Sequence, residues 1–388
     1  MSNHYKTQQN NIKHDDLNDQ QLVSFNYIQN YAMMNNFNIS FDDVFTASCN
    51  GNTTFLQQYK PADVTHIDIN QLFLDPKGKD LDKSALLSAT ENGHKTTIAQ
   101  LYNLFGNTIN PNARDKYDCT PLLVAARYGY IDCIKTLHSC FGDKIDCNAV
   151  DHKNYNVLMI AALKGHSECI TTLHNIYGDK IDYTVIDTHF KRNALMLAVK
   201  NGHINCITTL HNIYGNKFNC NAVDYKNYNI LMIAIIHSHN DCITTLHSIY
   251  GDKINIKAVD YNKRNVLMLA ARLDRKACIN TLYDIYGNTI NINAVNCAGK
   301  TALELATDNA NIKCAIKLCK LFGNQIHTNI DKVLVSSVSQ LHDGNNLLLS
   351  LYKYCNNNIN WDSDYLAKNN LIFKTISDLL FINRGIDL

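Results

Sequence analysis

The sequence predicts an all-α solenoid built from stacked helix-turn-helix units. Three observations support this prediction: a repeat of 36 residues, a helix pair within every repeat, and an apolar face that one pair cannot bury alone. The repeat is marked by Phe-Gly or Tyr-Gly followed by Asn or Asp. Its glycines lie at intervals of 36 residues, with one interval of 37: Gly106, Gly142, Gly178, Gly215, Gly251, Gly287 and Gly323. Seven units therefore occupy about residues 81–328.

Each unit has the same internal order of elements. In residues 148–183 the polar stretch NAVDHKNY predicts a turn, and Asn156 stands where a helix N-cap is expected. The segment VLMIAALK then predicts a short apolar helix that Gly165 and His166 end. A second, amphipathic helix follows and stops at Gly178, in the manner of a C-terminal glycine. The order is therefore hairpin, helix, turn, helix.

The central units also repeat in pairs. Blocks near residues 148–220 and 221–292 read almost alike, because NAVDHKNYNVLMIA in the first becomes NAVDYKNYNILMIA in the second. The units between them share KRNALMLA and KRNVLMLA. This indicates a tandem duplication, so a surface pattern is expected to recur in every second unit.

These motifs resemble the ankyrin repeat over about three quarters of the chain. The family's T-P-L-H-x-A-A motif is similar to TPLLVAA at Thr120–Ala126, and the other units carry NVLMIAA, NALMLAV, NILMIAI, NVLMLAA and TALELAT. The family's Gly-His pair and hairpin aspartate are also present. They stand at Gly93-His94, Gly165-His166 and Gly202-His203, and at Asp115, Asp151, Asp224 and Asp260. The resemblance implies a solenoid of stacked helix pairs with short β-hairpin or loop tips.

Three departures from the family pattern affect the hairpins. The usual period is about 33 residues, and here the extra residues fall at the end of the second helix and in the hairpin approach. The motif proline survives only as Pro121, and the tip glycine only as Gly299. Asp118, Asn154 and Asn227 replace that glycine, and such residues tolerate a positive φ better than most.

The two ends of the chain predict degenerate units. Residues 1–38 read as a polar tail with a capping helix, and residues 39–80 as a degenerate helix pair followed by a connection. Residues 329–388 read as degenerate C-terminal capping helices. Such ends are expected because terminal repeats need polar outer faces.

Composition excludes several classes of protein. Of the 388 residues, 46% are hydrophobic and 18% charged, and 36 Lys and Arg balance 35 Asp and Glu to a net charge of +1. Such a balance exerts no global attraction toward nucleic acid or membrane. The longest apolar run, Ile230–Ile236, is too short to span a bilayer. No signal peptide is visible, so the 14 cysteines predict free thiols in a reducing, cytoplasmic compartment.

Two ladders of repeated side chains raise the question of chemistry. Cys169, Cys206 and Cys242 each follow a histidine by three residues, a spacing that resembles metal ligation. The family pattern places an apolar residue there, however, and a small buried thiol suits a core. We therefore expect no metal and no cofactor. A second ladder, at His138, His174, His211 and His247, predicts a half-buried position, with a pH-sensing stack as the alternative.

Catalysis is not predicted. Every Cys and His candidate recurs in several copies, and GxSxG, P-loop, GxGxxG and HExxH motifs are absent from the sequence. Trp361, Asp362 and Asp364 in the C-terminal segment are the weak exceptions. They support an alternative in which the last 60 residues are an enzyme or an enzyme modulator and the repeats dock its substrate.

The hairpin tips and the ends of the first helices carry the strongest functional pattern. In the family that the chain resembles, these positions form the concave binding face. Here they are basic and aromatic, and Tyr and Arg are enriched at binding hot spots. The predicted partner-binding residues are Tyr117, Arg127, Lys153, Tyr155, Lys164, Phe190, Arg192, Lys200, Tyr225, Lys226, Tyr228, Tyr261, Arg264, Arg272 and Lys300.

The resulting hypothesis is a non-enzymatic, monomeric scaffold that binds an acidic protein partner. Nucleic acid is a disfavoured alternative ligand, because the net charge is close to zero. The Asn-, Ile- and Lys-rich array also resembles those of secreted effectors from intracellular bacteria, or of large amoebal viruses. That resemblance implies a host protein as partner and the host cytosol as location.

Overall fold

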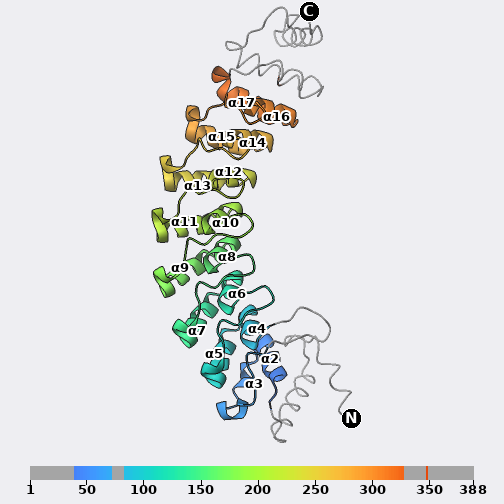
Figure 1. Ribbon diagram of the computed structural model, residues 1–388, viewed down its shortest axis with the longest axis vertical. Coiled ribbons are helices and arrows are strands. Elements are labelled where there is room, and N and C mark those ends of the chain that lie inside the picture. Colours follow the sequence, from blue (N-terminus) through green and yellow to red (C-terminus); the bar gives the residue numbers. More distant parts are fainter. Residues whose placement is uncertain (1–38, 72–82, 327–346, 348–388) are drawn as a thin grey trace, which may run out of the picture.

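The computed structural model describes residues 39–71, 83–326 and 347. Helix pairs stack one upon another into an elongated column, with all first helices on one side and all second helices on the other (Figure 1). Within the described residues no β-strand occurs, and the hairpin tips are turns. The predicted all-α solenoid is confirmed.

Seven regular units make up most of the column. Each first helix packs against the first helix of the next unit, and each second helix against the next second helix. The first helices are α4 Ala85–Glu91, α6 Pro121–Tyr128, α8 Val157–Lys164, α10 Ala194–Lys200, α12 Ile230–Ile236, α14 Val266–Arg272 and α16 Ala302–Asp308. The second helices are α5 Lys95–Phe105, α7 Ile131–Phe141, α9 Ser167–Tyr177, α11 Ile204–Tyr214, α13 Asn240–Tyr250, α15 Lys276–Tyr286 and α17 Ile312–Phe322.

A shorter pair precedes these units. Helix α2 Phe41–Asn50 begins at Ser40, whose hydroxyl accepts the Asp43 N–H while the Asp43 carboxylate accepts the Ser40 N–H. Helix α3 Thr53–Leu56 and the 3-10 turn η2 Pro61–Val64 follow. This pair lies within the stretch expected to hold a degenerate unit. The expected capping elements in residues 1–38 and 329–388 lie outside the described residues, Leu347 excepted.

Asparagine caps the central first helices and also joins neighbouring units. The Asn229 side-chain oxygen accepts the Met232 N–H at 3.0 Å, and its amide donates to the Asn255 carbonyl of the next unit at 3.2 Å. Asn156 caps α8 in the predicted way and donates to Asp182 O at 2.6 Å. A single side chain therefore satisfies an orphan N–H of its own helix and a carbonyl of the following hairpin.

A second set of asparagines bridges units at the hairpin approach. The Asn148 amide donates to Lys180 O at 2.8 Å, and its oxygen accepts the Asp182 N–H at 2.8 Å. The same two-bond bridge is made by Asn70, Asn112 and Asn221. The bridges give the many asparagines a structural reason, because a side-chain amide presents a donor and an acceptor together.

All the regular second helices except α17 end at a glycine whose φ is positive. At Gly178 φ is 55° and ψ is −133°, a backbone conformation open to residues without a Cβ. A 3-10 turn of three residues starts at that glycine in every regular unit. These turns are η3 Gly106–Thr108, η4 Gly142–Lys144, η5 Gly178–Lys180, η6 Gly215–Lys217, η7 Gly251–Lys253, η8 Gly287–Thr289 and η9 Gly323–Gln325. Three extra residues per unit match the difference between 36 and the usual period of about 33.

The core runs through the whole column. Nearly every side chain of a first helix is buried, whereas a second helix buries one face, as Cys206, Ile207 and Leu210 do in α11. The cysteines at the position of Cys206 are buried in all six units that carry one, as the core interpretation of the ladder predicts. Burial raises the pKa of the Cys206 thiol to about 12.

We expect Asn229→Ala to lower the free energy of unfolding by about 2 kcal/mol, because it removes a helix cap and leaves a carbonyl of the next unit unsatisfied. Urea unfolding followed by circular dichroism measures this. Asn212→Ala on the exposed side of α11 is the control and should change stability by less than about 0.5 kcal/mol. Equal effects of the two variants would contradict the bridging role.

We also expect the ladder cysteines to resist alkylation in the folded protein. Burial keeps these thiols protonated and away from the reagent, whereas Cys297 is exposed. Iodoacetamide labelling at pH 8, mapped by mass spectrometry, should modify Cys297 first and the ladder only in denaturant. Ladder labelling as fast as that of Cys297 would refute the core assignment.

Candidate functional site

The hairpin tips are locked to one another by backbone hydrogen bonds. In most tips an aspartate accepts N–H groups of its own turn, as Asp151 does from Lys153 and Tyr155 at 2.9 Å each, and Asn296 has this role in the last described tip. Consecutive tips are then joined by one further bond. These bonds run from His152 N to Tyr117 O (3.1 Å), Thr188 N to Lys153 O (3.2 Å), Tyr225 N to Phe190 O (2.9 Å), Tyr261 N to Lys226 O (3.4 Å) and Cys297 N to Asn262 O (3.0 Å).

Positive backbone φ angles occur at the tips where the sequence predicts them. Asp118, Asn154 and Asn227 have φ values of 60°, 64° and 64°. Lys191 and Lys263 adopt the same conformation at 56° and 55°, which their side chains do not favour. The tip geometry is therefore imposed by the neighbouring tips as well as by the residue at the turn.

This ladder of turns presents aromatic side chains to solvent. Tyr117 is 45% exposed, Phe190 37%, Tyr225 36% and Tyr261 71%; we call these four residues the tip aromatics. Phe190 and Tyr225 contact edge to face with ring centroids 5.4 Å apart. Because the backbone bonds hold the turns, these rings lose little conformational freedom when a partner packs on them.

Basic side chains line the same face. Lys153 and Lys226 are exposed on the tips, and Lys226 Nζ lies 5.3 Å from the Tyr225 ring centroid. Lys200, at the end of α10, lies 5.9 Å from the Phe190 ring centroid, so the helix ends and the tips share one face. We call the surface formed by the tips and the ends of the first helices the tip face.

Three more cations and a histidine occupy the ends of first helices on the tip face. Lys164 and Arg272 are exposed, and Arg127 and His237 are half-buried. Burial lowers the pKa of His237, and the neighbouring Arg192 and Lys200 lower it further. Burial also lowers the pKa of Lys200, with Arg192 and Lys153 acting in the same direction.

Arg192 and Arg264 require a correction. The sequence position places both among surface contact residues, but Arg192 is only 7% exposed. Its Nε and Nη2 donate to the Asp224 carboxylate of the next tip at 3.1 and 2.8 Å. Arg264 donates to Asp260 of its own tip at 2.7 Å and is also largely buried. Both guanidinium groups hold the tips together, and their charge is neutralised within the chain.

Three further predicted contact residues are partly buried or already paired within the chain. Tyr155 and Tyr228 are half-buried. Lys300 Nζ lies 2.7 Å from the Asp308 carboxylate. Within the part of the chain that the structure describes, the predicted contact residues with an exposed or half-buried side chain and no ion pair are the tip aromatics, Tyr155, Tyr228, Lys153, Lys164, Lys200, Lys226 and Arg272.

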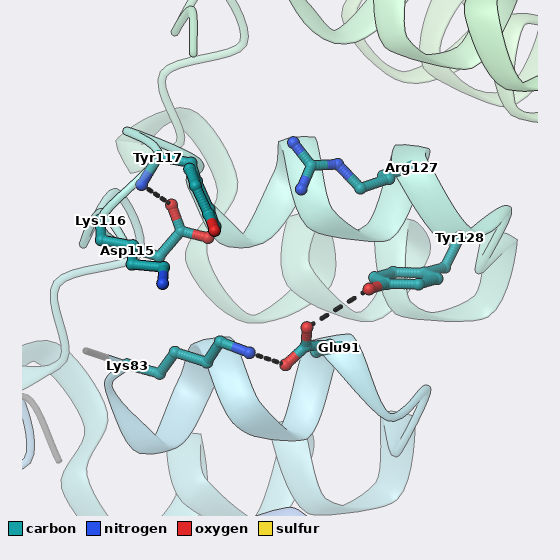
Figure 2. Close-up of a pocket in the computed structure, with 7 residues that line it drawn as sticks. All are labelled: Lys83, Glu91, Asp115, Lys116, Tyr117, Arg127 and Tyr128. Atoms are coloured by element: carbon teal, nitrogen blue, oxygen red, sulfur yellow. Dashed lines mark hydrogen bonds and ion pairs between the residues drawn. The ribbon is translucent and has the colours of Figure 1, made fainter. Parts of the chain in front are cut away.

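The N-terminal end of the tip face holds a shallow hollow of about 200 Å³ (Figure 2). Its charges satisfy one another: Glu91 forms an ion pair with Lys83 and accepts the Tyr128 hydroxyl at 3.3 Å. Arg127, on the opposite side of the hollow, donates to Cys119 Sγ at 2.9 Å and lies 3.9 Å from Asp151. The hollow contains no nucleophile paired with a base, so it offers no catalytic constellation.

The histidines that precede the second helices act between units. His166 Nε2 lies 3.2 Å from the Arg127 carbonyl at the end of the preceding first helix. The same contact is made by His94 to Cys49 O, by His203 to Leu163 O and by His239 to Lys200 O. The His/Cys spacing is therefore explained by a hydrogen bond and a core position. No cluster of three metal-ligating side chains occurs in residues 39–71 or 83–326.

Each histidine of the second ladder contacts a tyrosine of the next unit and not another histidine. His138 contacts Tyr177 of the next unit edge to face, with ring centroids 5.4 Å apart. The same pairs are His174–Tyr214, His211–Tyr250 and His247–Tyr286. The histidines are half-buried, as expected, and each imidazole packs on a ring of the following unit.

The stacked helix pairs and the ladder of tips define a repeat solenoid with exposed aromatic and basic side chains along one face. Comparison with known proteins identifies the class further. The model for ankyrin repeats (3 copies) matches residues 45–151, 141–219 and 158–258, which together cover 214 of 388 residues. The chain belongs to the ankyrin-repeat family.

Solved structures of similar fold include two ankyrin-repeat domains. The human ASB11 ankyrin repeat domain is 23% identical, with a TM-score of 0.48 over 58% of this chain and 92% of that chain. The ankyrin repeat domain of Bcl-3 is 18% identical, with a TM-score of 0.48 over 62% of this chain and 96% of that chain. A search of curated proteins found no match.

No helix in residues 39–71 or 83–326 has the length and the apolar character that crossing a membrane requires.

We expect Arg192→Leu to lower the free energy of unfolding by about 3 kcal/mol, because Asp224 would keep a buried charge without its partner. Urea unfolding measures the loss. Lys164→Gln, at an exposed and unpaired position, is the control and should change stability by less than about 0.5 kcal/mol. An Arg192→Leu protein as stable as the wild type would contradict the structural role of Arg192, which would then count again as a surface contact residue.

Proposed function

We propose that this protein is a non-enzymatic scaffold that binds an acidic protein partner on its tip face. The family supports the general statement, since ankyrin repeats act in protein–protein interaction. The observation that supports the specific one is the row of tip aromatics, exposed on turns that backbone bonds hold in place. Exposed aromatic rings with restricted freedom are effective anchors at protein interfaces.

The charges beside these rings favour an acidic partner. Lys153, Lys226, Lys164 and Lys200 stand on the tip face and form no ion pair with the described residues. The tip aspartates instead point into their own turns, where they accept backbone N–H groups. Complementary charge raises the association rate and excludes partners of the wrong sign.

A monomer in a reducing cytosol fits this function. The six ladder cysteines are unpaired thiols inside the core, a form that persists in reducing compartments. If the protein is a secreted effector, the cytosol in question is that of a host cell and the partner a host protein. That extension rests on the composition of the array.

The two alternatives receive less support. The residues named for an enzymatic C-terminal segment, Trp361, Asp362 and Asp364, lie outside the described residues. A nucleic-acid ligand would require phosphate contacts over a basic surface, but acids stand on the tip face at both ends, at Glu91 and Asp308.

We expect replacement of the four tip aromatics, Tyr117, Phe190, Tyr225 and Tyr261, by alanine to weaken partner binding at least tenfold without unfolding the protein. The measurement is affinity capture from cell lysate with quantitative mass spectrometry, followed by titration of each retained protein. Circular dichroism establishes that the variant is folded.

The matched control replaces four exposed residues of the second helices, Lys135, Asn175, Asn212 and Asp284, by alanine. Partners of the wild-type protein should bind this control unchanged. If the tip variant retains the same partners with the same affinity, the tip face is not the binding surface.

A further inference from the structure

One position in the repeat carries charges of opposite sign at the ends and in the middle of the array. Seven residues after the N-cap, at the end of the first helix, the two terminal units have acids, Glu91 and Asp308. The units between them have Arg127, Lys200 and Arg272 or an aliphatic residue. Where the residue is aliphatic, in α8 and α12, the next residue supplies a basic side chain, Lys164 or His237.

In the terminal units the acid is already bound by the chain itself. Glu91 pairs with Lys83, and Asp308 pairs with Lys300 at 2.7 Å. Both lysines stand immediately before the N-cap of the same helix. These two pairs show that a carboxylate fits on the tip face beside the end of a first helix, held by a cation of the chain.

The central units of α8, α10 and α12 have the cations without the carboxylate. Lys164 and Lys200 form no ion pair within the described part of the chain. The nearby acids form no ion pair with them: Asp224 holds Arg192 and two N–H groups of its tip, and Asp187 accepts N–H groups of its own tip. Asp187 raises the pKa of Lys200, but burial and Arg192 outweigh it. The unbalanced positive charge is therefore concentrated at the centre of the tip face.

The basic groups in this region disfavour one another's charged forms, although Arg192 is paired with Asp224. The pKa values of Lys200 and His237 are lowered by burial first and by their cationic neighbours second. A carboxylate bound between them would pair with the partly desolvated Lys200 ammonium and would favour the protonated form of His237. Phe190 stands beside Lys200 and supplies an apolar surface for the chain that carries the acid.

We propose that Lys164, Lys200 and His237 form a row of carboxylate subsites that binds an extended, Asp- or Glu-rich segment of the partner protein. This proposal rests on the proposed function and names the chemistry of the partner. Carboxylate is favoured over phosphate because, in the terminal units, a single lysine holds each carboxylate beside the end of a first helix. A long polyanion is disfavoured because Glu91 and Asp308, at the two ends of the row, would repel its negative charge.

The direct test uses a fluorescein-labelled peptide of eight glutamates, with an octaglutamine peptide as the uncharged comparison. Fluorescence anisotropy in low salt should show saturable binding of the glutamate peptide alone, and added salt should weaken it. The double variant Lys164→Gln and Lys200→Gln should raise the Kd about tenfold. The control Lys135→Gln and Lys313→Gln removes the same charge from exposed second-helix positions and should leave the Kd within about twofold.

A converse variant tests the role of the terminal acids. Asp308→Asn frees Lys300 and should strengthen binding of the glutamate peptide by up to about fivefold, since a partly exposed ion pair is the competitor. Weaker or unchanged binding by this variant would contradict the parallel between the terminal pairs and the central subsites.

The remaining outcomes separate this proposal from the proposed function. Equal loss in the central and control variants, or tighter binding of single-stranded DNA of eight nucleotides at the same lysines, would overturn the carboxylate row. If the glutamate peptide does not bind but the tip-aromatic variant loses its protein partners, the row is refuted while the scaffold function stands. If that variant keeps every partner, the scaffold function itself fails, whatever the peptide does.

Discussion

Burial between neighbouring units is the constraint on which the rest of this structure depends. A first helix such as α12 is apolar on nearly every side, so it is stable only between α10 and α14. No unit has a core of its own, and the free energy of the array is a sum of interfaces between adjacent units. The column is therefore elongated, with its surface divided into repeating faces.

Polar bridges give those interfaces a fixed geometry. Apolar burial is non-directional, but the amides of Asn148 and Asn221 meet a donor and an acceptor of the next unit at defined distances. The histidine bonds and the tip-to-tip backbone bonds add further contacts at each interface. The tip face is thus held by the bonds that set the stacking, so binding residues on separate units keep constant positions relative to one another.

Local features of the sequence predicted a large part of this arrangement. The period, the asparagine N-cap at Asn156, the buried cysteines and the positive φ at Asn154 each follow from residues close together in the chain. Contacts between units were harder to predict from the sequence. Nothing adjacent to Arg192 indicates that Asp224, one unit later, removes it from the surface, and the turn histidines gave no sign of bonding to the preceding unit. A signal existed in the register of Arg192 and Asp224 within the duplicated block, but only stacking shows that the two meet.

The duplication and the nearest-neighbour bridges together have a consequence for how the protein varies in length. Because each bridge reaches only the next unit, the gain or loss of a two-unit block alters polar contacts at the boundaries of that block alone. Such a block can be gained or lost while both acid-bearing terminal units keep their interfaces. The number of central blocks then sets the length of the partner segment that can lie along the tip face. The two terminal units set where that segment ends.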